Sequence, residues 1–481
     1  MKLNRFWKVA GAVVLLCLGS TPAFAAGRVF TSDVVIIGAG GAGLAAAVSA
    51  AQAGAKVTVL EKLPVIGGHT IISGGSVNAP DPERQAKAGI KDSPDLFFEQ
   101  TLRAGDYRGE PGVVRVLADN ATDMLKWFES LGLKWDDRVF EAWGGLYPRS
   151  HNSGAAAAGK DYIRVLNDNA KKLGVSIKTN TKVVELIREA NGGPVIGLKA
   201  VNKAGDTDTY LAKAVIVATG GFTANIPMRM KYNPRLNEKF RTTANPQGKA
   251  LDGSTGDGII MAKKIGADDV GMDYIQLIPF SGGRVIDYVG GDIFVNFDGK
   301  RFVNEGGRRD AISDAILSQR GQKMWVITDD QSIKGASLHT KLEKGIVYKA
   351  DTIEEMAKKM NVDPKVLQNT LERYNQYGKD KQDPDFGKTM FTQVIDKAPY
   401  YFGIETADVH FTCGGLRISP STEVIDLDNK VIPGLYAAGE TTGGIHGTNR
   451  AGGNSLTAIF VFGRIAGTNA AKLAASKVAA K

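Results

Sequence analysis

The sequence predicts an α/β fold in which buried parallel strands alternate with helices. Its 481 residues are 43% apolar and 23% charged, which is typical of a large globular protein rather than of a disordered or fibrous chain. An apolar run at 34–37 leads directly into a glycine-rich turn, an Ala-rich stretch at 44–54 and a β-branched run at 56–60. This order of strand, helix and strand predicts the βαβ unit of a Rossmann-like domain.

The first 25 residues have the three parts of a secretory signal peptide. Basic residues come first, an apolar stretch follows at 9–18, and small residues surround a cleavage site after Ala25. A retained membrane anchor is the alternative, but the apolar stretch is shorter than the ~20 residues that a spanning helix needs. We therefore expect a protein exported to the periplasm without a stable membrane anchor.

Cysteine content and charge exclude several classes of site. Once the signal peptide is removed, Cys413 is the only cysteine, so neither an internal disulfide nor a cysteine-ligated metal or iron–sulfur site is expected. The formal net charge of +9 comes from scattered residues, with no basic run that alternates with aromatic side chains. We expect neither a metal centre nor a nucleic-acid partner.

The glycine-rich turn at 38–43 has the spacing G-x-G-x-x-G between a strand and a helix. Glycines allow the backbone to approach a pyrophosphate, and the N-terminus of the helix offers free N–H groups and partial positive charge. An acid at the end of the second strand can accept hydrogen bonds from the ribose hydroxyls. The residues predicted to bind a dinucleotide are Gly38, Gly40, Gly41, Ala42, Gly43 and Glu61.

Two later segments indicate which dinucleotide is bound. The apolar run at 214–218 leads into Thr219, Gly220 and Gly221, the run at 434–439 leads into Glu440, and Gly67, Gly68 and His69 follow the second strand of the βαβ unit. Several glycine-ended strands that return to one cofactor look like the two-part FAD domain of flavoproteins rather than a nicotinamide dehydrogenase. FAD is the predicted cofactor.

From Asp33 to about Gly467 the chain resembles the fumarate reductase and succinate dehydrogenase flavoprotein family, most closely its soluble periplasmic flavocytochrome c branch, but without a haem domain. The motifs that carry the resemblance are ATGG at 218–221, STGDG at 254–258, GKRFVNE at 299–305, HFTCGG at 410–415 and GETTGGIHGTNRAGGN at 439–454. The resemblance implies a Rossmann-like FAD-binding domain built from both chain ends, residues 26–275 and 411–481, with an inserted smaller α+β capping domain at 276–410.

The resemblance also implies further contacts with FAD. Members of the family that are bound to membranes attach FAD covalently through a histidine near the position of His69, whereas soluble members have asparagine there. A covalent bond stays open, and we expect non-covalent binding. The additional residues implied are Lys62, Gly68, His69, Thr70, Gly74, Gly75, Gly220, Asp257, Gly439, Glu440, Asn454, Ser455 and Leu456.

Members of the family reduce an activated C=C bond by hydride transfer from flavin N5 to one alkene carbon and proton delivery by an arginine to the other. Arg309 matches that arginine, although an ion pair with Asp310 or Glu305 is the alternative for its side chain. His410 and Arg450 match the residues that bind the substrate carboxylate, a group that the planar fork of arginine suits well.

The distal part of the predicted substrate site departs from the family. Fumarate reductases have a Gln-x-His-Pro-Thr stretch and a downstream Thr-Glu pair, whereas this chain has Ile278 and Phe280 and lacks the pair. An arginine of the proton relay corresponds to Tyr288. A second carboxylate would be desolvated here unless Arg284 compensates. Asp287 is predicted either to receive a protonated imidazole or to recharge Arg309. The predicted substrate-binding residues are Ile278, Phe280, His410, Arg450 and Gly453.

We therefore expect an FAD-dependent reductase of a monocarboxylic 2-enoate, such as urocanate, methacrylate, acrylate or cinnamate, in periplasmic anaerobic respiration. The electron donor would be a separate periplasmic c-type cytochrome. Fumarate reductase proper is the first alternative. A 3-ketosteroid dehydrogenase-like enzyme would use tyrosines as acid and base, and an electron-transfer flavoprotein would not need the converging cations.

Overall fold

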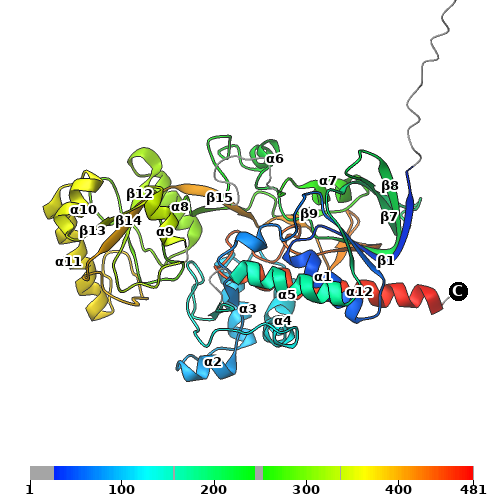
Figure 1. Cartoon of the computed structure of the whole chain (residues 1–481), viewed down its shortest axis with the longest axis horizontal. Helices are drawn as coiled ribbons and strands as arrows, with labels where there is room; N and C mark the ends of the chain where they lie inside the picture. The colour runs from blue at the N-terminus through cyan, green and yellow to red at the C-terminus, as the bar shows by residue number, and fades with distance from the viewer. Residues whose placement is uncertain (1–26, 155–157, 244–252, 336, 480–481) are drawn as a thin grey trace, which may run out of the picture.

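The computed structural model describes residues 27–154, 158–243, 253–335 and 337–479, and it confirms the predicted α/β fold. The predicted signal peptide at 1–25 lies outside these residues. In the larger part of the molecule, an eight-stranded sheet runs in the order β17-β18-β8-β1-β2-β5, with β7 and β6 added beside β8 (Figure 1). Its strands are β1 (Val29–Ile37), β2 (Val57–Leu60), β5 (Ser176–Lys178), β6 (Lys182–Arg188), β7 (Val195–Val201), β8 (Thr207–Val217), β17 (Glu423–Ile425) and β18 (Val431–Ala437).

The neighbours β18, β8, β1, β2 and β5 are parallel, so the carboxyl ends of these strands meet at one edge of the sheet. The apolar run predicted at 214–218 is the end of the longer strand β8, which begins at Thr207. Likewise α1 (Gly41–Gln52) begins inside the glycine-rich turn, before the Ala-rich stretch.

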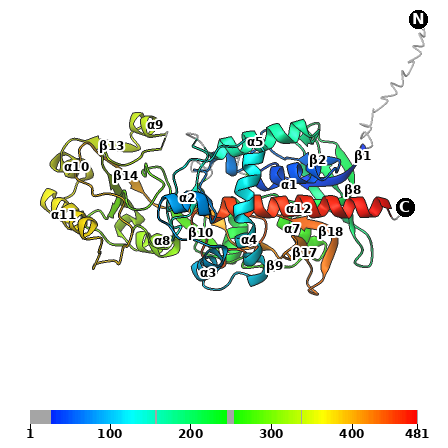
Figure 2. The same ribbon diagram turned by 90° about the horizontal axis from the view of Figure 1, so that it is seen from below.

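The two ends of the chain meet where α1 packs against α12 (Asn454–Ala479), on one face of the sheet (Figure 2). Small residues allow this close approach. A Cβ on Gly463 would lie 2.6 Å from the Ala42 carbonyl oxygen, and one on Gly467 would lie 2.2 Å from that of Ala46. The Ala-rich composition of α1 thus reflects helix packing as well as helix propensity.

Short elements complete the larger part. Two small antiparallel pairs form between β3 (Val77–Asn78) and β4 (Ser150–His151) and between β9 (Asp269–Val270) and β16 (Gly415–Leu416). Helix α4 packs against both α3 and α12. The helices are α2 (Pro82–Lys87), α3 (Pro94–Ala104), α4 (Pro111–Ser130), α5 (Ala158–Lys172), α6 (Ile226–Tyr232), α7 (Asp257–Lys264) and the 3₁₀ turn η1 (Thr70–Ile72).

Residues 280–406 form a smaller part, here called the cap, to one side of the larger sheet (Figure 1). The chain enters it through β10 (Ile275–Pro279) and leaves through β15 (Ala407–Thr412), which pair antiparallel and span the predicted domain boundaries. The cap has an antiparallel sheet in the order β11-β12-β14-β13. Its elements are β11 (Ile293–Val295), α8 (Arg309–Leu317), η2 (Arg320–Gln322), β12 (Met324–Thr328), α9 (Leu338–Glu343), β13 (Val347–Ala350), α10 (Ile353–Met360), α11 (Pro364–Asp380) and β14 (Tyr400–Glu405).

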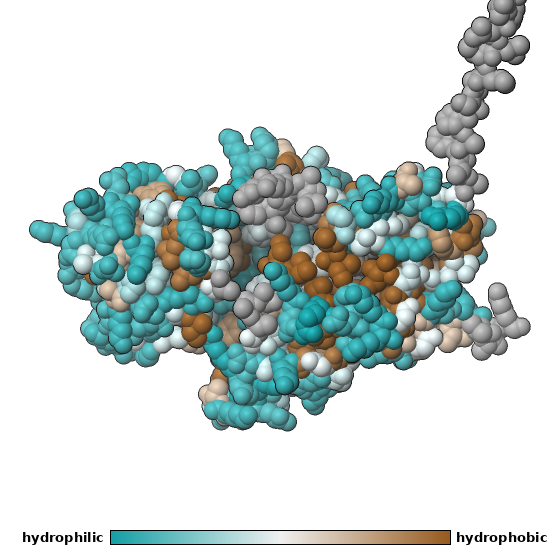
Figure 3. Space-filling view, in the orientation of Figure 1, coloured by the Kyte–Doolittle hydropathy of each residue, from teal (hydrophilic) through white to brown (hydrophobic). Residues whose placement is uncertain are grey.

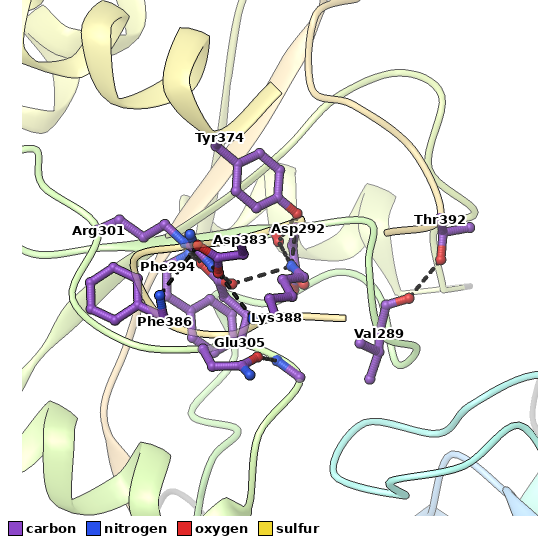
Figure 4. Close-up of polar contacts among 12 residues, drawn as sticks. Val289, Asp292, Phe294, Arg301, Glu305, Tyr374, Asp383, Phe386, Lys388 and Thr392 are labelled. Atoms are coloured by element: carbon purple, nitrogen blue, oxygen red, sulfur yellow. Dashed lines mark hydrogen bonds and ion pairs between the residues drawn. The ribbon is translucent and has the colours of Figure 1, made fainter. Parts of the chain in front are cut away.

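A buried network of charges holds the core of the cap together (Figure 4). Glu305 accepts hydrogen bonds from Arg301 at 2.7 Å and from Lys388 at 3.2 Å. Arg301 also pairs with Asp383, and Lys388 donates to the Tyr374 hydroxyl at 2.7 Å. The side chains of Glu305 and Lys388 are almost completely buried, so each charge depends on these partners.

No helix in the described ranges is both long and apolar enough to cross a membrane.

We predict that Lys388→Met lowers the free energy of unfolding by about 3–5 kcal/mol, because it removes one partner from a buried ion pair. Lys359→Met is the matched control, since Lys359 forms an exposed pair with Glu355 that contributes about 0–1 kcal/mol. Urea unfolding of both variants checks this, and equal shifts would contradict the stabilising role of the network.

Candidate active site

A cavity of about 320 Å³ lies at the carboxyl ends of β1, β2 and β8 and extends to the cap. Figure 3 shows the surface hollowed between the two parts, with apolar side chains gathered beside the hollow on the larger part. Among the predicted site residues, Gly43 and Asn454 do not line the cavity. Those that do are Gly38, Gly40, Gly41, Ala42, Glu61, Lys62, Gly68, His69, Thr70, Gly74, Gly75, Gly220, Asp257, Ile278, Phe280, Asp287, Arg309, His410, Gly439, Glu440, Arg450, Gly453, Ser455 and Leu456.

The glycine-rich turn places the N-terminus of α1 at the cavity. Gly40 is the N-cap and has no side chain to accept from the first N–H groups of α1, which therefore stay available for an anion. Gly38 has a φ of +102°, a conformation that favours glycine. A Cβ on Gly43 would lie 1.9 Å from the Gly38 carbonyl oxygen, so Gly43 preserves the turn from behind.

The acid at the end of β2 is held by backbone groups. Glu61 is buried and accepts from the N–H of Ala39 at 2.8 Å and from that of Leu63 at 2.9 Å. Each carboxylate oxygen retains a second acceptor position, as binding of ribose hydroxyls requires.

The next residue, Lys62, lines the same cavity, pairs with Asp257 at 2.8 Å and donates to Thr255 at 2.5 Å. Although burial alone would raise the pKa of Asp257, the hydrogen bond from Lys62 lowers it below its ordinary value. With a helix N-terminus free of a side-chain cap and an oriented Glu61, the residues present fit the pyrophosphate and ribose of a dinucleotide such as FAD. Asn454 lies outside the cavity lining, where it accepts from Asn78 at 2.7 Å and donates to Thr101 at 3.1 Å.

Arg309, the first residue of α8, belongs to the cap, and its side chain lines the cavity. Its Nη2 and Nε donate to the Trp143 carbonyl at 2.7 and 3.2 Å, and its Nη1 approaches the Gln276 side-chain oxygen at 3.5 Å. The alternative of an ion pair with Asp310 or Glu305 is wrong, because Asp310 pairs with Arg308 and Glu305 with Arg301 and Lys388. Burial, reinforced by the charges of Arg450 and Arg284, lowers the pKa of Arg309 well below its ordinary value.

His410, on β15, lies near the same end of the cavity. Its Nδ1 shares a hydrogen bond of 2.8 Å with the Thr243 hydroxyl. Burial and the charges of Arg450 and Arg309 lower the pKa of His410 well below its ordinary value, so the ring is neutral. When Thr243 donates to Nδ1, the proton of the ring sits on Nε2 and can be donated to a substrate oxygen.

Arg450 lies in the loop before α12, with its guanidinium 4.5 Å above the Phe411 ring. Its Nη1 makes a long contact of 3.4 Å with the Ala451 carbonyl, and its buried Nε has no partner among the described residues. Burial lowers the pKa of Arg450 to about 10, so it still carries its charge at neutral pH. His446 also packs against Phe411, with the two rings nearly perpendicular, and does not line the cavity.

The residues predicted for the distal part of the substrate site line the same cavity but differ in character. Ile278 is buried and Phe280 is 41% exposed, and burial raises the pKa of Asp287, whose carboxylate lies beside Gly74. Arg284 does not serve a second carboxylate, because it forms a buried pair with Asp292 at 2.6 Å. The Tyr288 hydroxyl accepts from the Ile333 N–H, and Tyr288 does not line the cavity.

Sequence reasoning missed three residues that contact the predicted groups. Trp143 and Gln276 accept from Arg309, and Thr243 holds His410. The contacts of Trp143 and Thr243 join positions 166 and 167 residues apart, and no local pattern marks these two residues. Gln276 begins the stretch that corresponds to the Gln-x-His-Pro-Thr motif, but it was given no role there.

Comparison with known proteins defines the class of protein. The FAD binding domain family matches residues 33–456. The chain belongs to this family and, more narrowly, to the flavoproteins of the fumarate reductase and succinate dehydrogenase type. It is an FAD-dependent oxidoreductase acting on CH–CH bonds.

Three relatives support this assignment. Urocanate reductase of Eggerthella lenta is 40% identical over 469 residues, covering 92% of this chain and 75% of that protein. A fumarate reductase (cytochrome) of Shewanella frigidimarina is 38% identical over 453 residues, covering 92% and 77%. The open conformation of a flavocytochrome c3 fumarate reductase matches with a TM-score of 0.71 at 34% identity, covering 92% of this chain and 79% of that one.

We predict that Gly43→Ala abolishes FAD binding, because the added methyl group would collide with the Gly38 carbonyl and displace the turn. Gly112→Ala in α4 is the control, since its nearest neighbour would be an ordinary contact at 3.5 Å. The ratio of FAD to protein, read from the absorption spectrum, should fall below about one-tenth only in the first variant. Full FAD content in Gly43→Ala would contradict the assigned cradle.

Proposed function

We propose that the protein uses FAD to reduce the C=C bond of a 2-enoate that carries one carboxylate and, at its other end, an uncharged or basic group. The observation that carries the proposal is the mixed lining of the cavity. Arg309 and Arg450, which have no carboxylate partner among the described residues, supply positive charge to it, whereas Ile278, Phe280 and Asp287 supply apolar surface and one carboxyl group.

The substrate carboxylate is bound by Arg450 and His410. Arg450 has unused donors, and neutral His410 adds one N–H from β15. Charge-assisted hydrogen bonds to the carboxylate withdraw electron density from the alkene and hold it in place, so binding also activates the substrate. When bound, reduced FAD supplies the hydride that is added to one alkene carbon.

Arg309 donates the proton to the other alkene carbon. An ordinary guanidinium is too weak an acid for this step, but burial beside Arg450 lowers the pKa of Arg309. Its hydrogen bonds to neutral oxygens of Trp143 and Gln276 leave it without a carboxylate that would stabilise the charged form. Proton transfer from an oriented group of this kind accelerates such reactions by about 10²–10⁴-fold.

The distal group explains the choice of substrate. A second carboxylate would lie between apolar side chains and near Asp287, with Arg284 already paired to Asp292. Its desolvation would cost several kcal/mol. An imidazole could instead share a hydrogen bond with Asp287, and a urocanate reductase is among the relatives. We therefore place urocanate first, with cinnamate, acrylate and methacrylate after it, and assign Asp287 to the substrate rather than to Arg309.

Two alternatives are less well supported. Fumarate, the substrate in the name of the Shewanella frigidimarina relative, has two carboxylates, and the second would need a cationic or polar partner of its own. A steroid dehydrogenase with tyrosine as acid or base needs such a residue in the cavity, and no tyrosine is among the described residues that line it.

The proposal extends to the route of the electrons. We propose a separate c-type cytochrome as donor and the periplasm as compartment, because residues 1–25 have the pattern of a signal peptide and a relative is a fumarate reductase (cytochrome). FAD is proposed to be bound without a covalent bond to His69.

Steady-state oxidation of a reduced viologen dye tests which enoate the protein prefers as its substrate. We predict that urocanate exceeds fumarate in kcat/KM by at least ~100-fold, since several kcal/mol separate the two distal groups. Asp287→Asn should raise KM for urocanate about tenfold and leave acrylate unchanged, while Asp298→Asn on the surface changes neither. Fumarate as the fastest substrate by a wide margin would overturn the proposal.

A further inference from the structure

Trp143 connects the cap to the larger part of the molecule. It lies in the loop before β4, outside the cap, and is one of the largest fully buried side chains among the described residues. It also lines the cavity. Nothing in its sequence surroundings marks it as functional.

Three polar groups of Trp143 contact the cap. Its indole Nε1 donates to the Glu305 carbonyl at 2.6 Å, and its backbone N–H donates to the Asp287 carbonyl at 3.1 Å. Its own carbonyl accepts from Nη2 and Nε of Arg309. One residue of the larger part therefore bonds to three separate positions of the cap.

The aromatic ring and the residues around it restrict movement further. The Arg309 and Arg284 guanidinium carbons lie 5.3 and 4.9 Å from the Trp143 ring centroid. A Cβ on Gly144 would lie 2.7 Å from Cγ of Arg309, and one on Gly452 would lie 2.9 Å from its Nη2. The backbone on two sides is thus packed closely against the Arg309 side chain.

The partner of the indole is itself fixed. Glu305 is held through its carboxylate by Arg301 and Lys388 in the buried network of the cap (Figure 4). Its carbonyl is therefore a rigid acceptor for the Trp143 N–H. Removal of that N–H would leave a buried carbonyl without this partner and release the loop that holds Arg309.

We propose that Trp143 is a positioning residue that docks the cap and fixes the guanidinium of Arg309 toward the substrate. The part of this inference that concerns proton delivery by Arg309 rests on the proposed function. The part that concerns docking of the cap does not. Arg450 and His410 have no hydrogen bond to Trp143 among the described contacts, so loss of the indole N–H should affect proton delivery more than carboxylate binding.

Trp143→Phe tests the proposal, with Trp325→Phe as the matched control. Trp325 is a buried tryptophan of the cap, and among the described residues its indole N–H has no partner and its ring makes no cation–π contact with the Arg309 guanidinium. With the best enoate, Trp143→Phe should lower kcat by about 100-fold, leave KM within about threefold and increase the solvent deuterium isotope effect, because a misplacement of about 1 Å has effects of this size. Trp325→Phe should leave kcat, KM and the solvent deuterium isotope effect within about twofold of the wild-type values.

Amide hydrogen exchange gives a readout that does not depend on turnover. Exchange across residues 305–317 should be at least about tenfold faster in Trp143→Phe and unchanged there in Trp325→Phe. If Trp143→Phe does not fold, benzothienylalanine at position 143 removes the N–H without loss of volume, and the same results are expected. Equal kinetics and equal exchange in the variants of both tryptophans would overturn the proposal. Failure of the wild-type protein to reduce any enoate would overturn the proposed function alone. The amide hydrogen exchange rates of the variants would then show whether Trp143 docks the cap.

Discussion

Two buried guanidinium groups without a carboxylate partner determine the character of the site. Among the described residues, Arg309 and Arg450 make hydrogen bonds only to neutral oxygens. A buried charge is costly unless a counter-charge or several hydrogen bonds compensate it. An anionic substrate would complete this arrangement, and burial together with the repulsion from Arg450 and Arg284 lowers the pKa of Arg309. Burial of cations that lack a counter-charge therefore accounts both for the recognition of a carboxylate and for the acidity of the proposed proton donor.

The surrounding structure keeps that charge uncompensated. Nearby carboxylates are occupied elsewhere: Asp292 pairs with Arg284, and Glu305 pairs with Arg301 and Lys388. Burial raises the pKa of Glu440 and favours its neutral form. The cap thus places Arg309 at the cavity, while the other buried charges of the cap pair with one another.

The sequence predicted the features that depend on short stretches of chain. The turn at 38–43 and Glu61 were predictable, because strand, glycines, helix and acid follow one another directly, and the motif residues Arg309, His410 and Arg450 do line one cavity. Features that depend on contacts between distant segments were not predictable. The Trp143 carbonyl on Arg309 and the pairing of Arg284 with Asp292 depend on how the cap packs, which no spacing in the sequence reports.

The most direct test of the unpaired cations is the binding of an acid and of its amide to the oxidised holoenzyme. Titration of urocanate and urocanamide, followed by the change in the flavin spectrum, compares two molecules that differ in charge but hardly in shape. We expect the acid to bind at least ~100-fold more tightly, because the charged pair contributes about 3 kcal/mol or more in a buried site. Equal affinity of acid and amide would contradict the central role of Arg309 and Arg450.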